Sequence, residues 1–99
     1  MLKVKKTSVF DEWLLNLKDK EAKSRINRFL QRISKSGLSG DIEPVGEGIS
    51  EIRFHFGPGY RVYFVQRGNE IVVILGGGTK KTQSRDIAEA KKLASCITG

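Results

Sequence analysis

A chain of 99 residues, 38% of them hydrophobic and 29% charged, has the composition of one folded domain spanning residues 1–99, not of a disordered segment. Its 18 Lys and Arg outnumber its 11 Asp and Glu, and the net charge of +7 favours a polyanionic partner (RNA, DNA, the ribosome or an acidic protein) over a merely soluble basic protein. Cys96 is the only cysteine, and no apolar run resembles a membrane span or a secretory signal, so we expect a cytoplasmic protein with no disulfide and no membrane partner.

The N-terminal region predicts a strand followed by a short helix. Residues 2–7 alternate between apolar and polar types, which indicates a short edge strand. Ser8 stands where a helix N-cap belongs, with Asp11 three residues later as its acidic partner. The apolar stripe of the helix recurs at i, i+3, i+4 and i+7, and consists of Phe10, Trp13, Leu14 and Leu17. This spacing favours core packing of Trp13 over stacking on a ligand.

A second, longer helix follows, and the two should form a hairpin. Asp19 is its expected N-cap and Gly37 its expected end. The predicted buried stripe comprises Ala22, Ile26, Phe29, Leu30 and Ile33. The opposite face is strongly basic and carries Lys18, Lys20, Lys23, Arg25, Arg28, Arg32 and Lys35. Such a run is typical of a solvated helix face, which is the alternative to a binding surface.

Residues 37–48 are turn-like and acidic, and three strand patterns follow in quick succession. We expect these strands over residues 50–56, 60–66 and 70–75, with tight turns at residues 57–59 and 68–69. After the glycine triplet of residues 76–78, a last helix should begin at Gln83 or Ser84 and run to about Cys96. Its expected buried side chains are Ile87, Ala90, Leu93, Ala94 and Ile97.

The predicted fold class is therefore α+β, with the element order β-α-α-β-β-β-α. We expect the helices to pack on one face of a small twisted sheet.

Alternation within the predicted strands sorts their side chains onto two faces. Ile52, Phe54 and Phe56 should point at the helices, whereas Arg53, His55 and Arg61 should share the opposite face with Tyr63. Guanidinium groups bind phosphate through two parallel hydrogen bonds and aromatic rings stack on bases, so this face suits single-stranded nucleic acid. The alternative is that Arg53 and Arg61 merely pair with Glu51 or Glu70.

Several other chemistries lack the residues they need. Lys80 and Lys81 follow the glycine triplet, but the P-loop pattern is absent, so the triplet alone is a weak phosphate signal. The chain has no zinc-type cluster of Cys and His and no serine-hydrolase elbow, and we expect neither a metal nor a cofactor. His55 is the only histidine, which excludes a nuclease mechanism with paired histidines; a lone histidine is more often solvated or structural.

At this point a family resemblance is apparent. Residues 45–53 (VGEGISEIR) and 57–64 (GPGYRVYF) closely resemble toxins of the RelE/ParE superfamily, specifically the HigB-like "addiction module killer protein" branch. Residues 77–83 (GGTKKTQ) resemble the ending of that branch, with Thr79 where the family has Asp and Lys81 where it has Ser. With the N-terminal helix included, the resemblance covers nearly the whole chain.

The resemblance implies a RelE-like fold and the toxin of a type II toxin–antitoxin pair. Such toxins typically cleave mRNA on the translating ribosome and are neutralised by a cognate antitoxin, here expected to be a small helix-turn-helix protein. Arg61 matches the strand arginine that binds phosphate in the family, Arg53 the arginine of the preceding strand, and Lys80 the lysine after the glycines. The candidate catalytic residues are Arg61, Arg53, Lys80 and His55. The candidate RNA contacts are Lys81, Tyr63, Tyr60 and Arg85.

Metal-free RNA cleavage requires activation of the 2′-OH, stabilisation of charge on the pentavalent phosphate and protonation of the 5′-oxygen. Arginines suit the second task but are too basic to carry protons, which leaves Lys80, His55 or a ribosomal group as general acid or base. ParE-like relatives instead poison DNA gyrase without chemistry of their own, and an inactive, antitoxin-binding module is a third possibility. The basic cluster on the sheet discriminates between them, because RNA cleavage requires it and gyrase poisoning does not.

Overall fold

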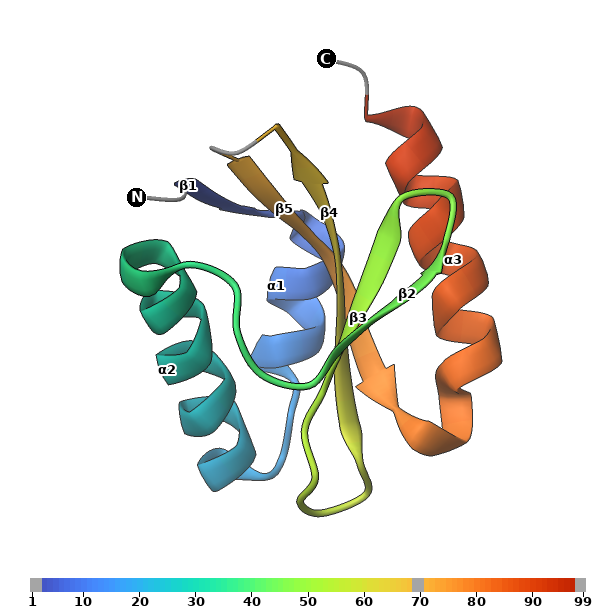
Figure 1. Cartoon of the computed structure of the whole chain (residues 1–99). Coiled ribbons are helices and arrows are strands. Elements are labelled where there is room, and N and C mark those ends of the chain that lie inside the picture. The colour runs from blue at the N-terminus through green and yellow to red at the C-terminus, as the bar shows by residue number, and fades with distance from the viewer. Residues whose placement is uncertain (1–2, 69–70, 98–99) are drawn as a thin grey trace.

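The structure is a computed structural model that describes residues 3–68 and 71–97. Five strands form one mixed sheet with the order β1-β5-β4-β3-β2, in which β1 runs parallel to β5 and the other neighbours are antiparallel (Figure 1). The elements are β1 (Lys3–Lys6), α1 (Ser8–Leu15), α2 (Lys20–Ser36), β2 (Ile42–Gly46), β3 (Ile49–Arg53), β4 (Tyr60–Arg67), β5 (Ile71–Thr79), a 3-10 turn η1 (Lys80–Thr82) and α3 (Gln83–Cys96). The predicted α+β class is confirmed, and within the described ranges no helix is long and apolar enough to cross a bilayer.

The helical hairpin forms as the amphipathic patterns predict. All five apolar side chains of the predicted α2 stripe are buried, Asp19 caps the helix by accepting a hydrogen bond from the backbone N–H of Ala22 (3.1 Å), and Gly37 ends it at a φ of 85°. The predicted N-cap of α1 is wrong by one residue. Thr7, not Ser8, accepts from the backbone N–H of Phe10 (3.1 Å), and its hydroxyl also donates to the carbonyl of Leu75 (2.8 Å). That second hydrogen bond ties the start of α1 to the sheet, which explains why Thr7 is the cap.

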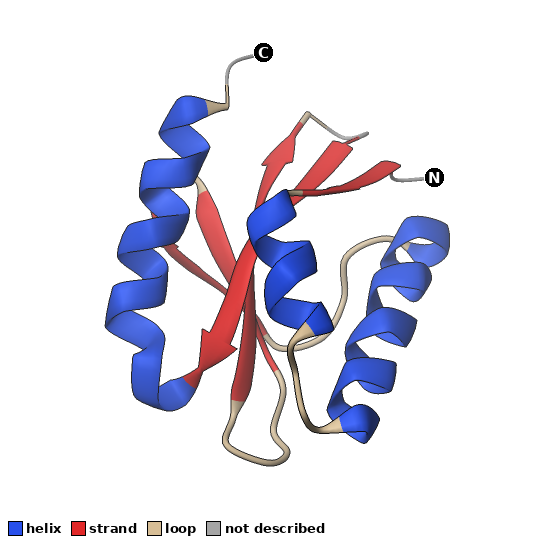
Figure 2. Cartoon of the chain, turned by 180° about the vertical axis from the view of Figure 1, so that it is seen from behind, coloured by secondary structure: helices blue, strands red, loops and turns tan. Residues whose placement is uncertain are grey.

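The prediction that every helix packs on one face of the sheet is wrong for α3. The helical hairpin covers one face, as Figure 2 shows from behind, whereas α3 packs on the opposite face through Ala90 and its neighbours. Val62 and Phe64 point into the core beneath the hairpin, and Tyr63 points into the core beneath α3. The middle strands are thus apolar on both sides, so their near-continuous hydrophobicity reflects burial on both faces.

Two predicted strand boundaries are also wrong, and one strand was missed. β2 lies at the sheet edge, where Pro44 and acidic residues are tolerated, so its sequence has the character of a turn. β3 ends at Arg53 instead of residue 56, and β5 continues through the glycine triplet to Thr79 instead of ending at Leu75. The prediction that Ile52, Phe54 and Phe56 point toward the helical hairpin is confirmed. Parts of three predicted elements lie outside the described residues. They are Leu2 of the predicted first strand, Asn69 of the turn and Glu70 of the third meander strand.

The glycines of β5 are explained by what packs against them. A Cβ atom at Gly77 would lie 2.4 Å from the ring of Trp13 in α1, and one at Gly78 would overlap the carboxylate of Asp86 in α3. Trp13 packs against the core between Phe10 and Tyr60, as its spacing predicted. The glycines therefore allow helices on both faces to approach the same strand.

Replacing Gly77 by Ala should destabilise the fold because the indole of Trp13 must move away from the strand. Overpacking of this kind costs about 1–3 kcal/mol in the free energy of unfolding. Gly76→Ala is the matched control, since a Cβ there would meet only Val9 at an ordinary 3.9 Å. Urea unfolding of the two variants measures the difference, and equal midpoints for both would contradict this explanation of the glycines.

Candidate functional site

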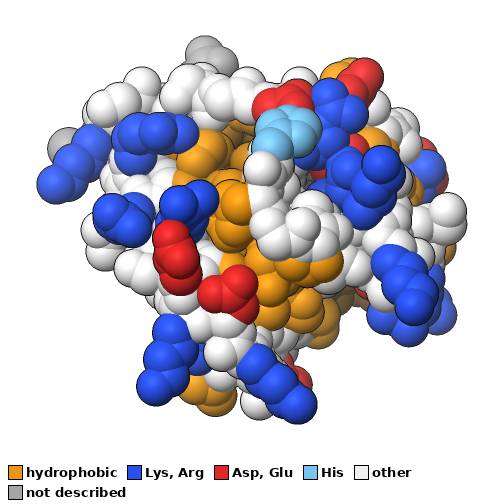
Figure 3. Space-filling view, turned by 90° about the horizontal axis from the view of Figure 1, so that it is seen from below, with side chains coloured by type: hydrophobic (Ala, Val, Ile, Leu, Met, Phe, Trp, Pro, Cys, Tyr) orange, Lys and Arg blue, Asp and Glu red, His pale blue; other side chains and the backbone are white. Residues whose placement is uncertain are grey.

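The four predicted catalytic residues surround one open cavity at the end of the sheet where β3 and β4 are joined. This basic hollow, about 720 Å³ in volume, is lined by Arg53, Phe54, His55, Phe56, Gly57, Pro58, Gly59, Arg61, Lys80 and Gln83. Arg53 and Arg61 lie directly opposite each other on β3 and β4, and the backbone N–H of Lys80 donates to the carbonyl of Gly59 (2.9 Å), which joins η1 to the turn. Figure 3 looks onto this end of the molecule, where the histidine lies next to both acidic side chains and Lys and Arg side chains.

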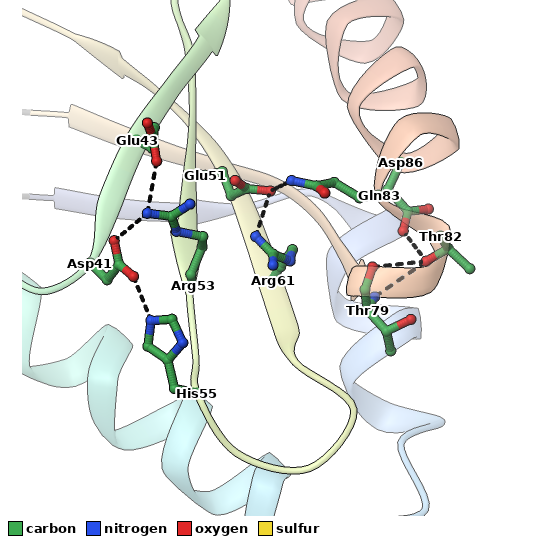
Figure 4. A network of polar contacts seen from close by, with 10 residues as sticks. All are labelled: Asp41, Glu43, Glu51, Arg53, His55, Arg61, Thr79, Thr82, Gln83 and Asp86. Carbon is green, nitrogen blue, oxygen red and sulfur yellow. Dashed lines mark hydrogen bonds and ion pairs between the residues drawn. The ribbon is translucent and has the colours of Figure 1, made fainter.

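Arg61 is held from below by a buried carboxylate. Its Nη1 lies 3.3 Å from Oε1 of Glu51, which also accepts a hydrogen bond from Nε2 of Gln83 at 2.7 Å (Figure 4). Glu51 is 2% exposed and Arg61 9%. The Nε of Arg61 is buried without an acceptor among the described residues. The pairing of Arg61 with Glu51, considered above as the alternative to phosphate binding, is therefore present, yet one nitrogen of the guanidinium has no acceptor.

Arg53 is held by a second acidic group at the mouth of the hollow. Its Nη2 contacts Asp41 at 2.8 Å and Glu43 at 2.7 Å, and the other carboxylate oxygen of Asp41 contacts Nε2 of His55 (Figure 4). The hydrogen bond from Arg53, reinforced by that from His55, lowers the pKa of Asp41 below its ordinary value of 3.8. The hydrogen bond to Asp41 raises the pKa of Arg53. Asp41 is thus ionised at neutral pH and holds both a guanidinium and an imidazole.

Neither of the two tyrosines proposed as RNA contacts is exposed. Tyr63 is fully buried beneath α3, and burial raises the pKa of its phenol. Tyr60 is 6% exposed and packs in the core against Trp13 and Phe56, and burial raises its pKa as well. The expected exposure of Tyr63 is therefore wrong because α3 covers its face of β4, and Tyr60 lies with Val62 and Phe64 beneath the hairpin, so neither ring is free to stack on a base.

Lys81 and Arg85 lie apart from the basic hollow. Both are exposed, but Lys81 in η1 is not among the residues that line it. Arg85 lies 3.7 Å from Asp86 and borders a different cavity of about 590 Å³ between α1, β5 and α3. That cavity contains none of Arg53, Arg61 and Lys80, so it is not the candidate site.

Three side chains that organise the site were not predicted from the sequence: Asp41, Glu43 and Gln83. The two acidic residues belong to a segment that has the composition of a turn, and Gln83 was expected only to start a helix. The glycine triplet, considered above as a weak phosphate signal, is closely packed: Gly77 lies against Trp13 and Gly78 against Asp86. In the part of the chain that the structure describes, no three His, Cys, Asp or Glu side chains gather as a metal site.

Comparison with known proteins places this architecture in a family. A protein of Haemophilus influenzae, named only as an uncharacterized protein, is 44% identical over 93 residues, which are 94% of this chain and 93% of that protein. The solution structure of the conserved hypothetical protein HP0894 from Helicobacter pylori aligns with a TM-score of 0.49 at 20% identity, covering 82% of this chain and 97% of that one. The family described as "Phage derived protein Gp49-like (DUF891)" matches residues 12–95, from α1 to the last turn of α3. The chain therefore belongs to the Gp49-like family of phage-derived proteins.

Proposed function

We propose that this protein is the toxin of a type II toxin–antitoxin pair, and that it arrests growth by metal-free cleavage of mRNA held on the ribosome. The Gp49-like family belongs with the addiction module killer proteins, which supports the toxin assignment. The observation that carries the cleavage proposal is the basic hollow, where Arg53, Arg61, His55 and Lys80 surround one cavity. The proposed unit is a single RelE/ParE-like toxin domain that acts in the cytoplasm.

In the proposed mechanism the scissile phosphate lies in the basic hollow against Arg61. The guanidinium is already oriented by Glu51, so it loses little freedom when it binds a phosphate oxygen. Its Nε has no acceptor among the described residues, so the guanidinium keeps an unused hydrogen-bond donor. As negative charge builds up on the pentavalent phosphate, hydrogen bonds in this shielded position strengthen, which lowers the barrier to cleavage.

The proposed proton carrier is His55, positioned by Asp41. An imidazole can accept the proton of the 2′-OH as that oxygen attacks the phosphate. The Asp41 carboxylate contacts Nε2 of His55, which holds the ring in place and leaves Nδ1 to take up the proton. The 5′-oxygen that leaves must then be protonated, and Lys80 on the other side of the hollow or a ribosomal group is the candidate donor.

The proposed partners are mRNA, the ribosome and a cognate antitoxin, which we expect to be a small helix-turn-helix protein. We propose that an acidic segment of the antitoxin covers the basic hollow, because it would compete directly with RNA phosphate and associate quickly with this charge. An antitoxin that instead clamps the basic face of α2 would leave the hollow open and inhibit by blocking entry to the ribosome.

One observation favours the alternative of a non-enzymatic, ParE-like gyrase poison. Arg53 and Arg61 already contact Asp41, Glu43 and Glu51, and arginines that only maintain the fold would do the same. Measuring mRNA cleavage and DNA supercoiling in the same induced cells separates these two functions.

Arg61→Lys should slow mRNA cleavage about a hundredfold, equivalent to about 3 kcal/mol of transition-state stabilisation. Lysine keeps the charge beside Glu51 but lacks the planar fork that binds phosphate. Arg61→Ala is the poorer test, because removing one partner of a buried ion pair costs about 3–5 kcal/mol of stability by itself. Cleavage rates are measured with translating ribosomes. The control is Lys5→Ala, because Lys5 is exposed and its loss removes one positive charge without touching the basic hollow. Unchanged cleavage by a folded Arg61→Lys protein refutes the phosphate role.

His55→Asn should lower the cleavage rate by about a hundredfold or more, and should remove the limb of the pH–rate profile that reports an imidazole. Asp41→Asn should have a smaller effect in the same direction, since the imidazole remains but its neighbouring carboxylate is gone. The measurement is the cleavage rate between pH 5 and 9 for the wild-type protein and the two variants. A His55→Asn profile with the wild-type shape would assign the proton transfer to Lys80 or to the ribosome instead.

A further inference from the structure

A second, shallower groove lies between α2 and the β3–β4 connection, next to the basic hollow. This arginine groove, about 550 Å³ in volume, is lined by Arg25, Arg28, Phe29, Arg32, Phe54 and Phe56. The three arginines belong to the basic face of α2, and a basic face of this kind is equally typical of a solvated helix surface. The three phenylalanines form the apolar part of the groove, Phe29 from α2 and the other two from the β3–β4 connection.

Two of the three groove arginines lie over aromatic rings. The guanidinium carbon of Arg25 is 4.6 Å from the ring centre of Phe56, and that of Arg32 is 4.9 Å from the ring centre of Phe29. Phe29 and Phe54 meet edge to face at 5.4 Å, which fixes the rings beneath. A guanidinium is planar, so one held over a ring can offer its other face to a nucleobase while phosphates contact the donors at its edge.

These arginines also differ from those of the basic hollow in how their charge is balanced. Arg53 and Arg61 each contact buried or half-buried carboxylates, whereas Arg28 and Arg32 form no ion pair with any residue that the structure describes. Arg25 pairs only with Glu21, an exposed neighbour one helical turn away, at 3.0 Å. Exposed pairs of this type contribute little, so the groove retains a net positive charge that can bind an external anion.

The groove and the basic hollow lie next to each other. Phe54 and Phe56 line both of them, because they follow the end of β3 and lie between α2 and the turn at residues 57–59. In Figure 3, Lys and Arg side chains flank a band of hydrophobic surface on this same face. A strand whose phosphate lies in the hollow therefore has an adjacent cationic and aromatic path along which it can continue.

We propose that the arginine groove binds the nucleotides on one side of the scissile phosphate as single-stranded RNA. The inference rests on the proposed function, because it takes the occupant of the basic hollow to be RNA. Stacking on the guanidiniums tolerates any base, so the groove supplies affinity and directs the strand without reading a sequence. An acidic protein segment would match the charge equally well but would leave the stacked guanidinium planes without a partner.

The test compares oligonucleotides that do and do not reach the groove. A trinucleotide and an octanucleotide of 2′-O-methyl RNA, which lacks the attacking hydroxyl, are titrated into the intact chain and their fluorescence anisotropy is measured. Arg28→Ala/Arg32→Ala should weaken binding of the octanucleotide about tenfold and leave the trinucleotide unchanged. The slope of log affinity against log salt should become shallower by about 1.4, or about 0.7 for each phosphate that the variant no longer binds. Arg28→Lys/Arg32→Lys should retain the salt slope and bind with an intermediate affinity.

The matched control is Lys3→Ala/Lys5→Ala, which removes two exposed positive charges from β1, away from the groove. Equal weakening by the control and the groove variant overturns the inference, as does an octanucleotide that binds the groove variant with wild-type affinity. Preferential binding of a polyglutamate peptide, abolished in the same variant, overturns it in favour of an acidic protein.

Cleavage assays keep the two proposals separate. If wild-type protein cleaves no mRNA but octanucleotide binding still depends on Arg28 and Arg32, the groove is supported and the proposed function fails. If cleavage depends on Arg61 while octanucleotide binding is independent of the groove, the function stands and the groove is refuted.

Discussion

The buried contact between Glu51 and Arg61 connects the fold to the candidate site. It joins β3 to β4, and Gln83 at the start of α3 contacts the same carboxylate oxygen, so one buried acid links three elements. A buried charge pair is costly to desolvate and adds little net stability by comparison with apolar packing, but breaking it leaves an uncompensated charge. An arrangement of this kind is better explained by the orientation it imposes on Arg61 than by the stability it adds.

The proposed RNA surface contains two kinds of arginine, which differ in whether carboxylates hold them in place. Arg53 and Arg61 are held by carboxylates before any ligand binds, which limits their motion and suits them to a reacting phosphate. Arg28 and Arg32 lack such partners among the described residues and lie on a helix face, which suits them to binding a strand loosely. In the proposed mechanism, a net charge of +7 attracts RNA to the whole molecule, and local pairing decides which arginines act on the scissile phosphate.

The parts of the structure that were predictable from sequence are those with a strong periodic pattern. The buried stripe and both ends of α2 followed from spacing and capping residues, and alternation correctly placed Arg53 and Arg61 on the same face. The extension of β5 through Gly77 was missed because the constraint on that glycine comes from Trp13, which is distant in sequence. Asp41 was missed because its partners are brought to it only by the pairing of β2 with β3, and Tyr63 was placed in solvent because α3 was assigned to the wrong face.

The chemistry of the RNA ends tests the proposed cleavage most directly. Attack by the 2′-OH on the phosphate held in the basic hollow must leave a 5′-hydroxyl on one fragment and a 2′,3′-cyclic phosphate, or the 3′-phosphate formed from it, on the other. Purified protein should produce these ends when it is added to mRNA on translating ribosomes, and end-specific ligation and mass spectrometry identify them. Fragments with 5′-phosphate ends, or intact mRNA in cells whose growth has nevertheless stopped, would contradict the proposed mechanism.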